Sequence, residues 1–147
     1  MPTAGPLKVK IMLFCGKQTA IGPGKAELLE AIERSGSISA GAREMGMSYR
    51  RAWTLVDTMN RSWTRPLVET SVGGIGRGGA SLSAFGVEVL RAYRTLERDL
   101  MNRAETGPFS AWANDLLSEP RPHEDDPRAS KETGEGQPRG RIQPASR

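Results

Sequence analysis

The sequence predicts a mainly α-helical fold with one small β-hairpin and a long C-terminal helix. Three observations support this. Apolar residues recur at helical spacing in four segments between 25 and 103, a glycine-rich hairpin pattern lies between 67 and 83, and proline and charge dominate from 118 onward. A chain of 147 residues suffices for one domain with its own core. We expect residues 1–117 to form that domain and residues 118–147 to form a disordered tail, because the tail has almost nothing apolar to bury.

The N-terminal part predicts a short strand, a loop and a first helix. Residues 8–14 alternate between apolar and polar side chains, which is typical of a strand, and the loop GKQTAIGPG follows. Residues 25–34 form the expected helix, and Gly36 favours its end. The apolar side of this helix carries Leu28, Leu29 and Ile32.

Two further helices are expected close together. Ser37 is placed to cap a short second helix that Gly46 ends, and Ser48 is placed to cap a third helix over 48–62. The third helix has an apolar stripe formed by Ala52, Leu55, Val56, Met59 and Trp63. Its opposite side carries Arg50, Thr54, Asp57, Thr58 and Arg61. We expect the apolar side to pack and the polar side to stay free.

A hairpin and a long helix complete the domain. Pro66 ends the helical region, residues 67–72 and 80–83 have strand character, and the glycine-rich GGIGRGG joins them. The helix over 84–103 carries more apolar residues than one small core covers, which predicts a homodimer interface. The residues assigned to that interface are Leu90, Tyr93, Leu96 and Leu100. The aromatic residues Trp53, Trp63 and Tyr93 are expected in the core or at an interface.

Two short helices joined by a tight turn and followed by a hairpin are the pattern of a winged helix-turn-helix. A plain helical hairpin in another small fold is the alternative. The charge distribution favours nucleic-acid binding, because residues 34–78 contain seven arginines and three acidic residues. Their difference, +4, equals the formal net charge of the whole chain.

Three segments resemble the N-terminal DNA-binding domain of the ModE-type, molybdate-responsive bacterial regulators. They are GSISAGAREMGMSYRRAWTLVDTMN (36–60), PLVETSVGGIGRGGASLSAFG (66–86) and VLRAYRTLE (89–97). The resemblance implies a winged helix related to that of LysR-type regulators, which dimerises and binds a double-stranded DNA operator. It also implies molybdate-binding β-barrel domains after this region. Residues 118–147 do not resemble such domains, so we expect no cofactor, and a separate molybdate-binding or other protein is a candidate partner.

The residues expected to bind DNA gather at the start of the third helix. The resemblance implies that Ser48, Tyr49, Arg50 and Arg51 begin the recognition helix. An arginine can grip guanine O6 and N7 bidentately, so we assign Arg50 to bases and leave Arg51 open between bases and phosphates. The full set of expected DNA-binding residues is Ser37, Ser48, Tyr49, Arg50, Arg51, Thr54 and Arg77. Arg77, in the glycine-rich tip, is expected to enter a minor groove or meet a phosphate.

Several other classes of protein are disfavoured. One cysteine and one histidine cannot close a tetrahedral zinc site, so no metal site is expected. The longest apolar run, Ile11–Cys15, is too short for a membrane span, which favours a cytoplasmic, nucleoid-associated protein. The G-x-G-x-x-G pattern of Gly74, Gly76 and Gly79 leads into another strand rather than a helix, unlike a dinucleotide-binding turn.

We therefore expect no catalytic residues and no enzyme activity. The segment GPGKA at 22–26 has Ala26 where a phosphate-binding loop carries serine or threonine. The sequence predicts a sequence-specific transcriptional regulator of the ModE type without the molybdate-binding domains. The alternative is a winged-helix protein-interaction module that reads no operator.

Overall fold

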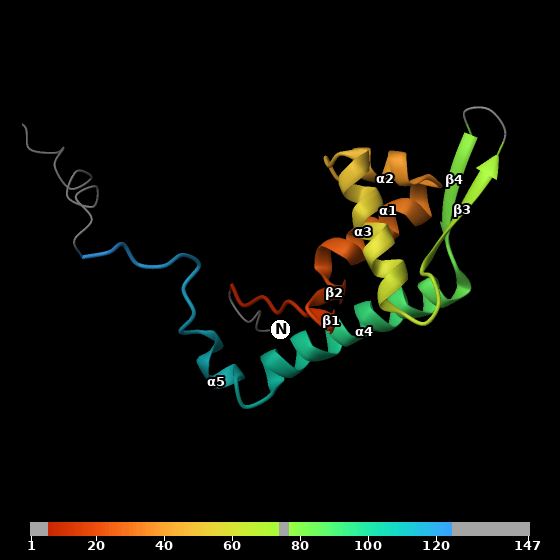
Figure 1. Cartoon of the computed structure of the whole chain (residues 1–147). Coiled ribbons are helices and arrows are strands. Elements are labelled where there is room, and N and C mark those ends of the chain that lie inside the picture. The colour runs from red at the N-terminus through yellow and green to blue at the C-terminus, as the bar shows by residue number, and fades with distance from the viewer. Residues whose placement is uncertain (1–5, 74–76, 125–147) are drawn as a thin grey trace, which may run out of the picture. The chain divides into compact units, whose positions relative to one another are not determined.

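The structure, a computed structural model, describes residues 6–73 and 77–124 (Figure 1). The chain divides into two units, residues 1–116 and residues 117–147. All helices and strands of the described residues lie in the first unit, whereas residues 117–124 of the second contain neither. No helix among the residues described has the length and apolar character needed to cross a lipid bilayer.

The N-terminal segment forms a two-stranded antiparallel hairpin, β1 (Leu13–Cys15) and β2 (Gln18–Ile21). The expectation of a strand over 8–14 followed by a loop was wrong in two respects, since the strand begins later and the loop contains a second strand. The reason is Gly16, whose φ of 60° lets a two-residue turn pair Cys15 with Gln18. The hairpin then directs the end of β2 into the core, where Ile21 is fully buried.

Helix α1 (Pro23–Ser35) lies at the centre of the domain. Pro23 occupies its first turn, and Gly36 ends it in the left-handed conformation with φ of 78°. The predicted stop at Gly36 is confirmed. The buried residues of α1 are Ala26, Leu28, Leu29, Ala31 and Ile32.

Helices α2 (Ile38–Glu44) and α3 (Tyr49–Ser62) form the predicted helix-turn-helix. Each begins at the predicted cap, because Ser37 Oγ accepts from Ala40 N at 3.0 Å and Ser48 Oγ accepts from Arg51 N at 3.1 Å. Close packing of α2 on α1 depends on Gly41. A Cβ there would lie 3.1 Å from Ile32 Cγ1 and 3.3 Å from its backbone nitrogen.

The wing consists of β3 (Val68–Gly73) and β4 (Arg77–Leu82), paired antiparallel with Thr70 opposite Ala80. Asn60 on α3 attaches its base, since Asn60 Oδ1 accepts from the backbone nitrogens of Leu67 at 2.9 Å and Val68 at 3.0 Å. Ala80 N donates to Gly36 O at 2.8 Å, which ties β4 to the turn between α1 and α2. These bonds hold the wing against the helix-turn-helix (Figure 1).

Helix α4 (Ala84–Thr106) is the longest element, and the short α5 (Ser110–Ala113) follows it. Ser83 caps α4 and is buried, and its Oγ donates to Pro66 O at 2.7 Å while accepting from Gly86 N at 2.9 Å. Gly86 permits the closest approach in the domain, because a Cβ at this position would lie 2.1 Å from Leu67 O. The start of α4 is therefore pressed against the base of the wing.

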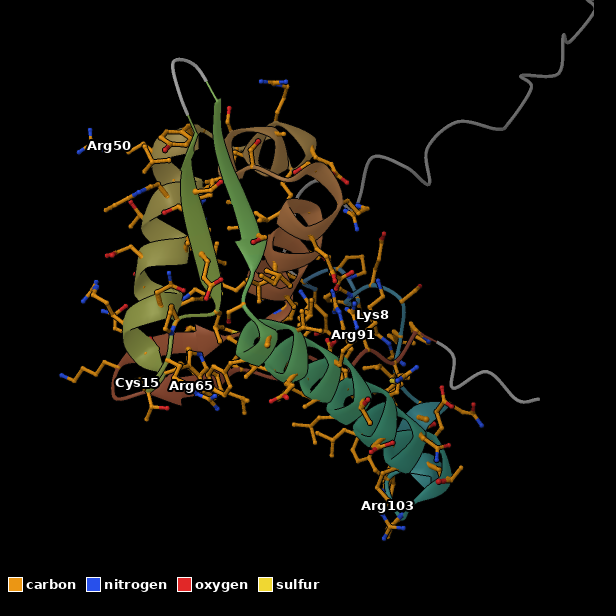
Figure 2. The ribbon with its side chains drawn as sticks, turned by 90° about the vertical axis from the view of Figure 1, so that its right-hand side faces the viewer. Lys8, Cys15, Arg50, Arg65, Arg91 and Arg103 are labelled. Atoms are coloured by element: carbon orange, nitrogen blue, oxygen red, sulfur yellow. The ribbon has the colours of Figure 1, made fainter. Side chains whose placement is uncertain are left out.

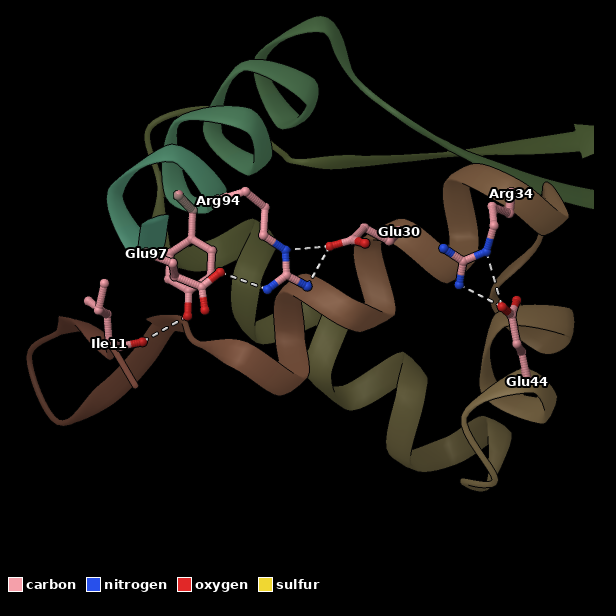
Figure 3. Close-up of polar contacts among 7 residues, drawn as sticks. Ile11, Glu30, Arg34, Glu44, Arg94 and Glu97 are labelled. Atoms are coloured by element: carbon pink, nitrogen blue, oxygen red, sulfur yellow. Dashed lines mark hydrogen bonds and ion pairs between the residues drawn. The ribbon is translucent and has the colours of Figure 1, made fainter. Parts of the chain in front are cut away.

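Polar contacts hold α4 against α1 and the N-terminal arm (Figure 3). Arg94 lies between two carboxylates, with Nε 2.5 Å from Glu30 Oε1 and Nη1 2.7 Å from Glu97 Oε1. The hydroxyl of Tyr93 donates to Ile11 O at 2.9 Å. Burial raises the pKa of Tyr93 to about 12, and the negative charge of Glu97 adds to the shift.

The four residues assigned to the dimer interface differ in exposure within this chain. Leu90 is fully buried and Tyr93 is 2% exposed, and both belong to the core cluster of the chain itself. Leu96 and Leu100, one and two turns further along α4, are exposed.

Candidate nucleic-acid interface

The start of α3 gathers five of the seven residues expected to bind DNA, namely Ser48, Tyr49, Arg50, Arg51 and Thr54. Ser48 Oγ accepts a hydrogen bond from the amide of Arg51. The other amides of the first turn are directed out of the helix. Tyr49, Arg50 and Arg51 follow the cap, and all three are exposed. Arg50 projects outward from the end of α3 that lies beside the wing (Figure 2).

Several exposed arginines lie at and near this end of α3. Arg43, Arg50 and Arg51 are exposed and form no ion pair with the residues that the structure describes. At the other end of the same helix, Arg61 Nε lies 3.0 Å from Asp57 Oδ2. The start of α3 thus combines free guanidinium groups with the positive end of the helix dipole, an arrangement that attracts anions.

The other arginines nearby have structural partners. Arg34 Nη2 pairs with Glu44 Oε1 at 2.5 Å, which links α1 to α2 (Figure 3). The Arg65 guanidinium stacks over Phe85, 4.2 Å from the ring centre. The sequence shows seven arginines in this region, but only the structure separates those that fold the domain from those that face solvent.

Thr54 is arranged to accept rather than to donate. Its Oγ1 donates to the backbone oxygen of Arg50 at 2.9 Å, one turn earlier on α3. The hydroxyl proton is therefore used within the helix, and the lone pairs remain available on the exposed side. Adenine and cytosine present amino donors in the major groove that such an oxygen can bind.

A groove of about 330 Å³ separates the helix-turn-helix from the wing. Its lining contains hydroxyl groups and glycines and includes no acidic side chain: Ser37, Ile38, Ser39, Tyr49, Thr70, Ser71, Gly78, Gly79 and Ala80. Gly79 permits the close approach of Ser71 on the paired strand, because a Cβ there would lie 2.8 Å from Ser71 Oγ. Hydroxyls and glycine backbone suit close contact with a phosphate backbone.

The sequence reasoning missed Ser39, Thr70 and Ser71. Strand alternation places Thr70 and Ser71 on opposite sides of a hairpin, but it does not say which side approaches α2. The bond between Ala80 N and Gly36 O decides that, and it joins residues that are distant in the sequence. The missing information was the pairing of the hairpin with the turn between α1 and α2.

The expectations for Arg77, Trp53 and Trp63 have different outcomes. Arg77 begins β4, but its side chain and residues 74–76 lie outside the described residues. Trp53, expected in the core or at an interface, is half exposed on α3, whereas Trp63 packs edge-on against Phe85 at 6.2 Å.

The lysine of the GPGKA segment connects α1 to the N-terminal hairpin. Lys25 donates through Nζ to the backbone oxygen of Thr19, and burial lowers the pKa of Lys25. Within the part of the chain that the structure describes, no three His, Cys, Asp or Glu residues gather in a way that holds a metal ion.

These features define a winged helix with an exposed basic helix at its helix-turn-helix. No family model matches the chain. Among curated proteins, it is 43% identical over 95 residues to the molybdenum transport protein ModE of Azotobacter vinelandii, covering 65% of this chain and 35% of that protein. It is 37% identical over 93 residues to the DNA-binding transcriptional dual regulator ModE of Escherichia coli K12, covering 63% and 34%.

A third relative is the molybdenum-pterin-binding protein MopB of Rhodobacter capsulatus, 44% identical over 77 residues, with 52% of this chain and 28% of that protein covered. The matches confirm the resemblance to ModE-type regulators over 77 to 95 residues of this chain. The chain spans about a third of the length of these relatives. None of the three is named as an enzyme.

Proposed function

We propose that this chain binds double-stranded DNA in a sequence-specific manner, as a transcriptional regulator of the ModE type and not as an enzyme. The observation that carries the proposal is the start of α3, where Arg50 and Arg51 are exposed and without ion pairs among the described residues, beside the wing. The relative from Escherichia coli, named as a DNA-binding transcriptional regulator, supports it.

In this proposal α3 enters the major groove with its first turn toward the bases. Arg50 meets a guanine edge, and Thr54 accepts from a neighbouring base amino group. Ser37 and Ser48 approach phosphates through the exposed sides of their capped turns, together with Arg51. Arg77 supplies a contact from the wing.

A homodimer through α4 would place two such helices on one operator. Leu96 and Leu100 are the exposed apolar residues of α4 that a second copy would cover. Half-sites would then lie roughly 34 Å apart, or at a multiple of that distance. Residues 1–117 are sufficient in this proposal, so a chain ending at 117 is expected to keep DNA binding.

The proposed setting is the bacterial cytoplasm, on the nucleoid. The names of the relatives MopB and ModE support a link to molybdenum. We propose a separate molybdate-binding or other protein as a partner of this chain.

The test begins with selection of duplexes from a random library, followed by affinity measurement on the selected duplex and on a random one. Arg50→Ala is expected to cost about 1–3 kcal/mol on the selected duplex and to relax preference at one base position in each half-site. Binding to the random duplex is expected to fall much less.

Arg121→Ala is the matched control. It removes the same side chain and charge from the segment after residue 117, which the proposal does not require for DNA binding, and it is expected to leave both affinities unchanged. A protein-interaction module would enrich no duplex at all. Equal loss on every sequence with Arg50→Ala would make Arg50 a phosphate contact instead of a base-reading residue.

A further inference from the structure

Trp53 lies on the exposed side of α3, close to the residues proposed to read DNA. It follows Arg50 by three residues and precedes Thr54 by one, so the helical period places it on the side that carries Arg50. The buried stripe of the helix consists of Ala52, Val56 and Met59 and lies opposite Arg50, and Trp53 lies between the two.

Trp53 is only half covered by the rest of the domain, with 50% of the residue exposed. Within the described residues its ring contacts no other aromatic ring and its indole N–H has no acceptor. Trp63, ten residues later, is the contrasting case. Its ring packs against Phe85 and its Nε1 donates to Ala20 O at 3.3 Å.

An exposed tryptophan among polar residues has few matching surfaces on duplex DNA. The bases present donors and acceptors in the major groove, and the one apolar group there is the C5-methyl of thymine. Three helical residues rise about 4.5 Å along the axis, comparable with the 3.4 Å spacing of base pairs. With α3 in the major groove, a ring at position 53 would therefore lie within reach of a base pair adjacent to the one that Arg50 meets, or of the next.

We propose that Trp53 is a specificity-determining residue that contacts the C5-methyl group of a thymine within two base pairs of the position that Arg50 reads. This inference rests on the proposed function, since it requires α3 to lie in the major groove. It adds an apolar contact to a site otherwise built from hydrogen-bond donors and acceptors.

The test replaces each thymine of the selected duplex by deoxyuridine, which keeps base pairing and removes only the methyl group. With the wild-type protein, one replacement in each half-site is expected to raise Kd about fourfold, the fold-change for losing one buried methyl-sized group. With Trp53→Ala, the thymine and deoxyuridine duplexes are expected to bind equally. Trp53→Phe is expected to retain part of the difference.

Trp112→Ala is the matched control, because Trp112 is also an exposed tryptophan but lies on α5, and it is expected to keep the full difference. The inference is overturned if no deoxyuridine replacement weakens wild-type binding, or if the weakening persists in Trp53→Ala. In both cases specific binding to the selected duplex leaves the proposed function standing. Failure to enrich any duplex overturns both.

Discussion

At the start of α3, Arg50 and Arg51 extend into solvent without an ion pair among the described residues, whereas at the contact between α1 and α4 Arg94 lies between Glu30 and Glu97. The two regions differ in composition, because α3 carries three arginines and one carboxylate, whereas α1 and α4 together carry seven carboxylates. The difference lies in whether a carboxylate from another element reaches the guanidinium. Arginines held by the fold stabilise it, and arginines left free by the fold remain available to a ligand.

The comparison predicts that stability and DNA affinity depend on separate sets of residues. The largest expected effect is on stability, at the joint between the wing and α4. Gly86→Ala places a Cβ where the carbonyl oxygen of Leu67 lies, 2.1 Å away, and backbone cannot yield easily. We expect it to lower the free energy of unfolding by about 3 kcal/mol, measured by chemical denaturation.

Gly24→Ala is the control for that substitution. Gly24 also lies in a helix, but a Cβ there would meet nothing within 4 Å. It is expected to raise stability by about 0.5 kcal/mol, because alanine restricts the unfolded chain. A Gly86→Ala protein as stable as the wild type would show that α4 does not press on the wing as described.

Arg94→Met tests the structural half of the comparison. It leaves Glu30 and Glu97 facing each other without their shared partner, and we expect a loss of about 2 kcal/mol in the free energy of unfolding. Kd of the folded protein for the selected duplex is expected to stay the same. Arg50→Ala should give the reverse, with stability within about 0.5 kcal/mol of the wild type. If each substitution changed both quantities, the two regions would be coupled.

Tyr93→Phe tests the same contact through pH. It removes the hydrogen bond to Ile11 O, at a cost of about 1 kcal/mol. The folded pKa is raised from its ordinary value of 10.0 to about 12, so the neutral phenol favours the folded state. The contribution of Tyr93 is therefore complete below about pH 10 and is lost as the pH rises through about 12.

The measurement is unfolding of both proteins between pH 9 and 12, with Tyr49→Phe as the exposed control. The wild type and Tyr49→Phe are expected to lose stability more steeply than Tyr93→Phe above about pH 10. Equal slopes in all three would mean that Tyr93 titrates like an exposed tyrosine.

Substitutions at Ser48 separate the two roles within one residue. Ser48→Ala is expected to cost about 1 kcal/mol, because the amide of Arg51 loses its cap. Ser48→Asp keeps a good cap, so it should retain stability while weakening DNA binding through repulsion of phosphates. Retained DNA affinity in Ser48→Asp would place Ser48 away from the DNA.

Much of the fold was accessible from the sequence because its signals are local. The caps at Ser37 and Ser48, the stop at Gly36 and the buried stripe of α3 each depend on residues within one or two helical turns. The hairpin of the wing followed in the same way from strand character on both sides of a glycine-rich segment.

Only the tertiary structure decided which apolar residues are buried and which arginines are paired. The apolar stripe of α4 is continuous in the sequence, but its first part, with Leu90 and Tyr93, is covered by the core of this chain and its later part, with Leu96 and Leu100, is not. Among the described residues Arg34 is paired and Arg50 is not, because only the first lies near a carboxylate of another helix. Periodicity reports which side of a helix is apolar or charged, whereas burial and ion pairing depend on what other segments of the chain bring to that side.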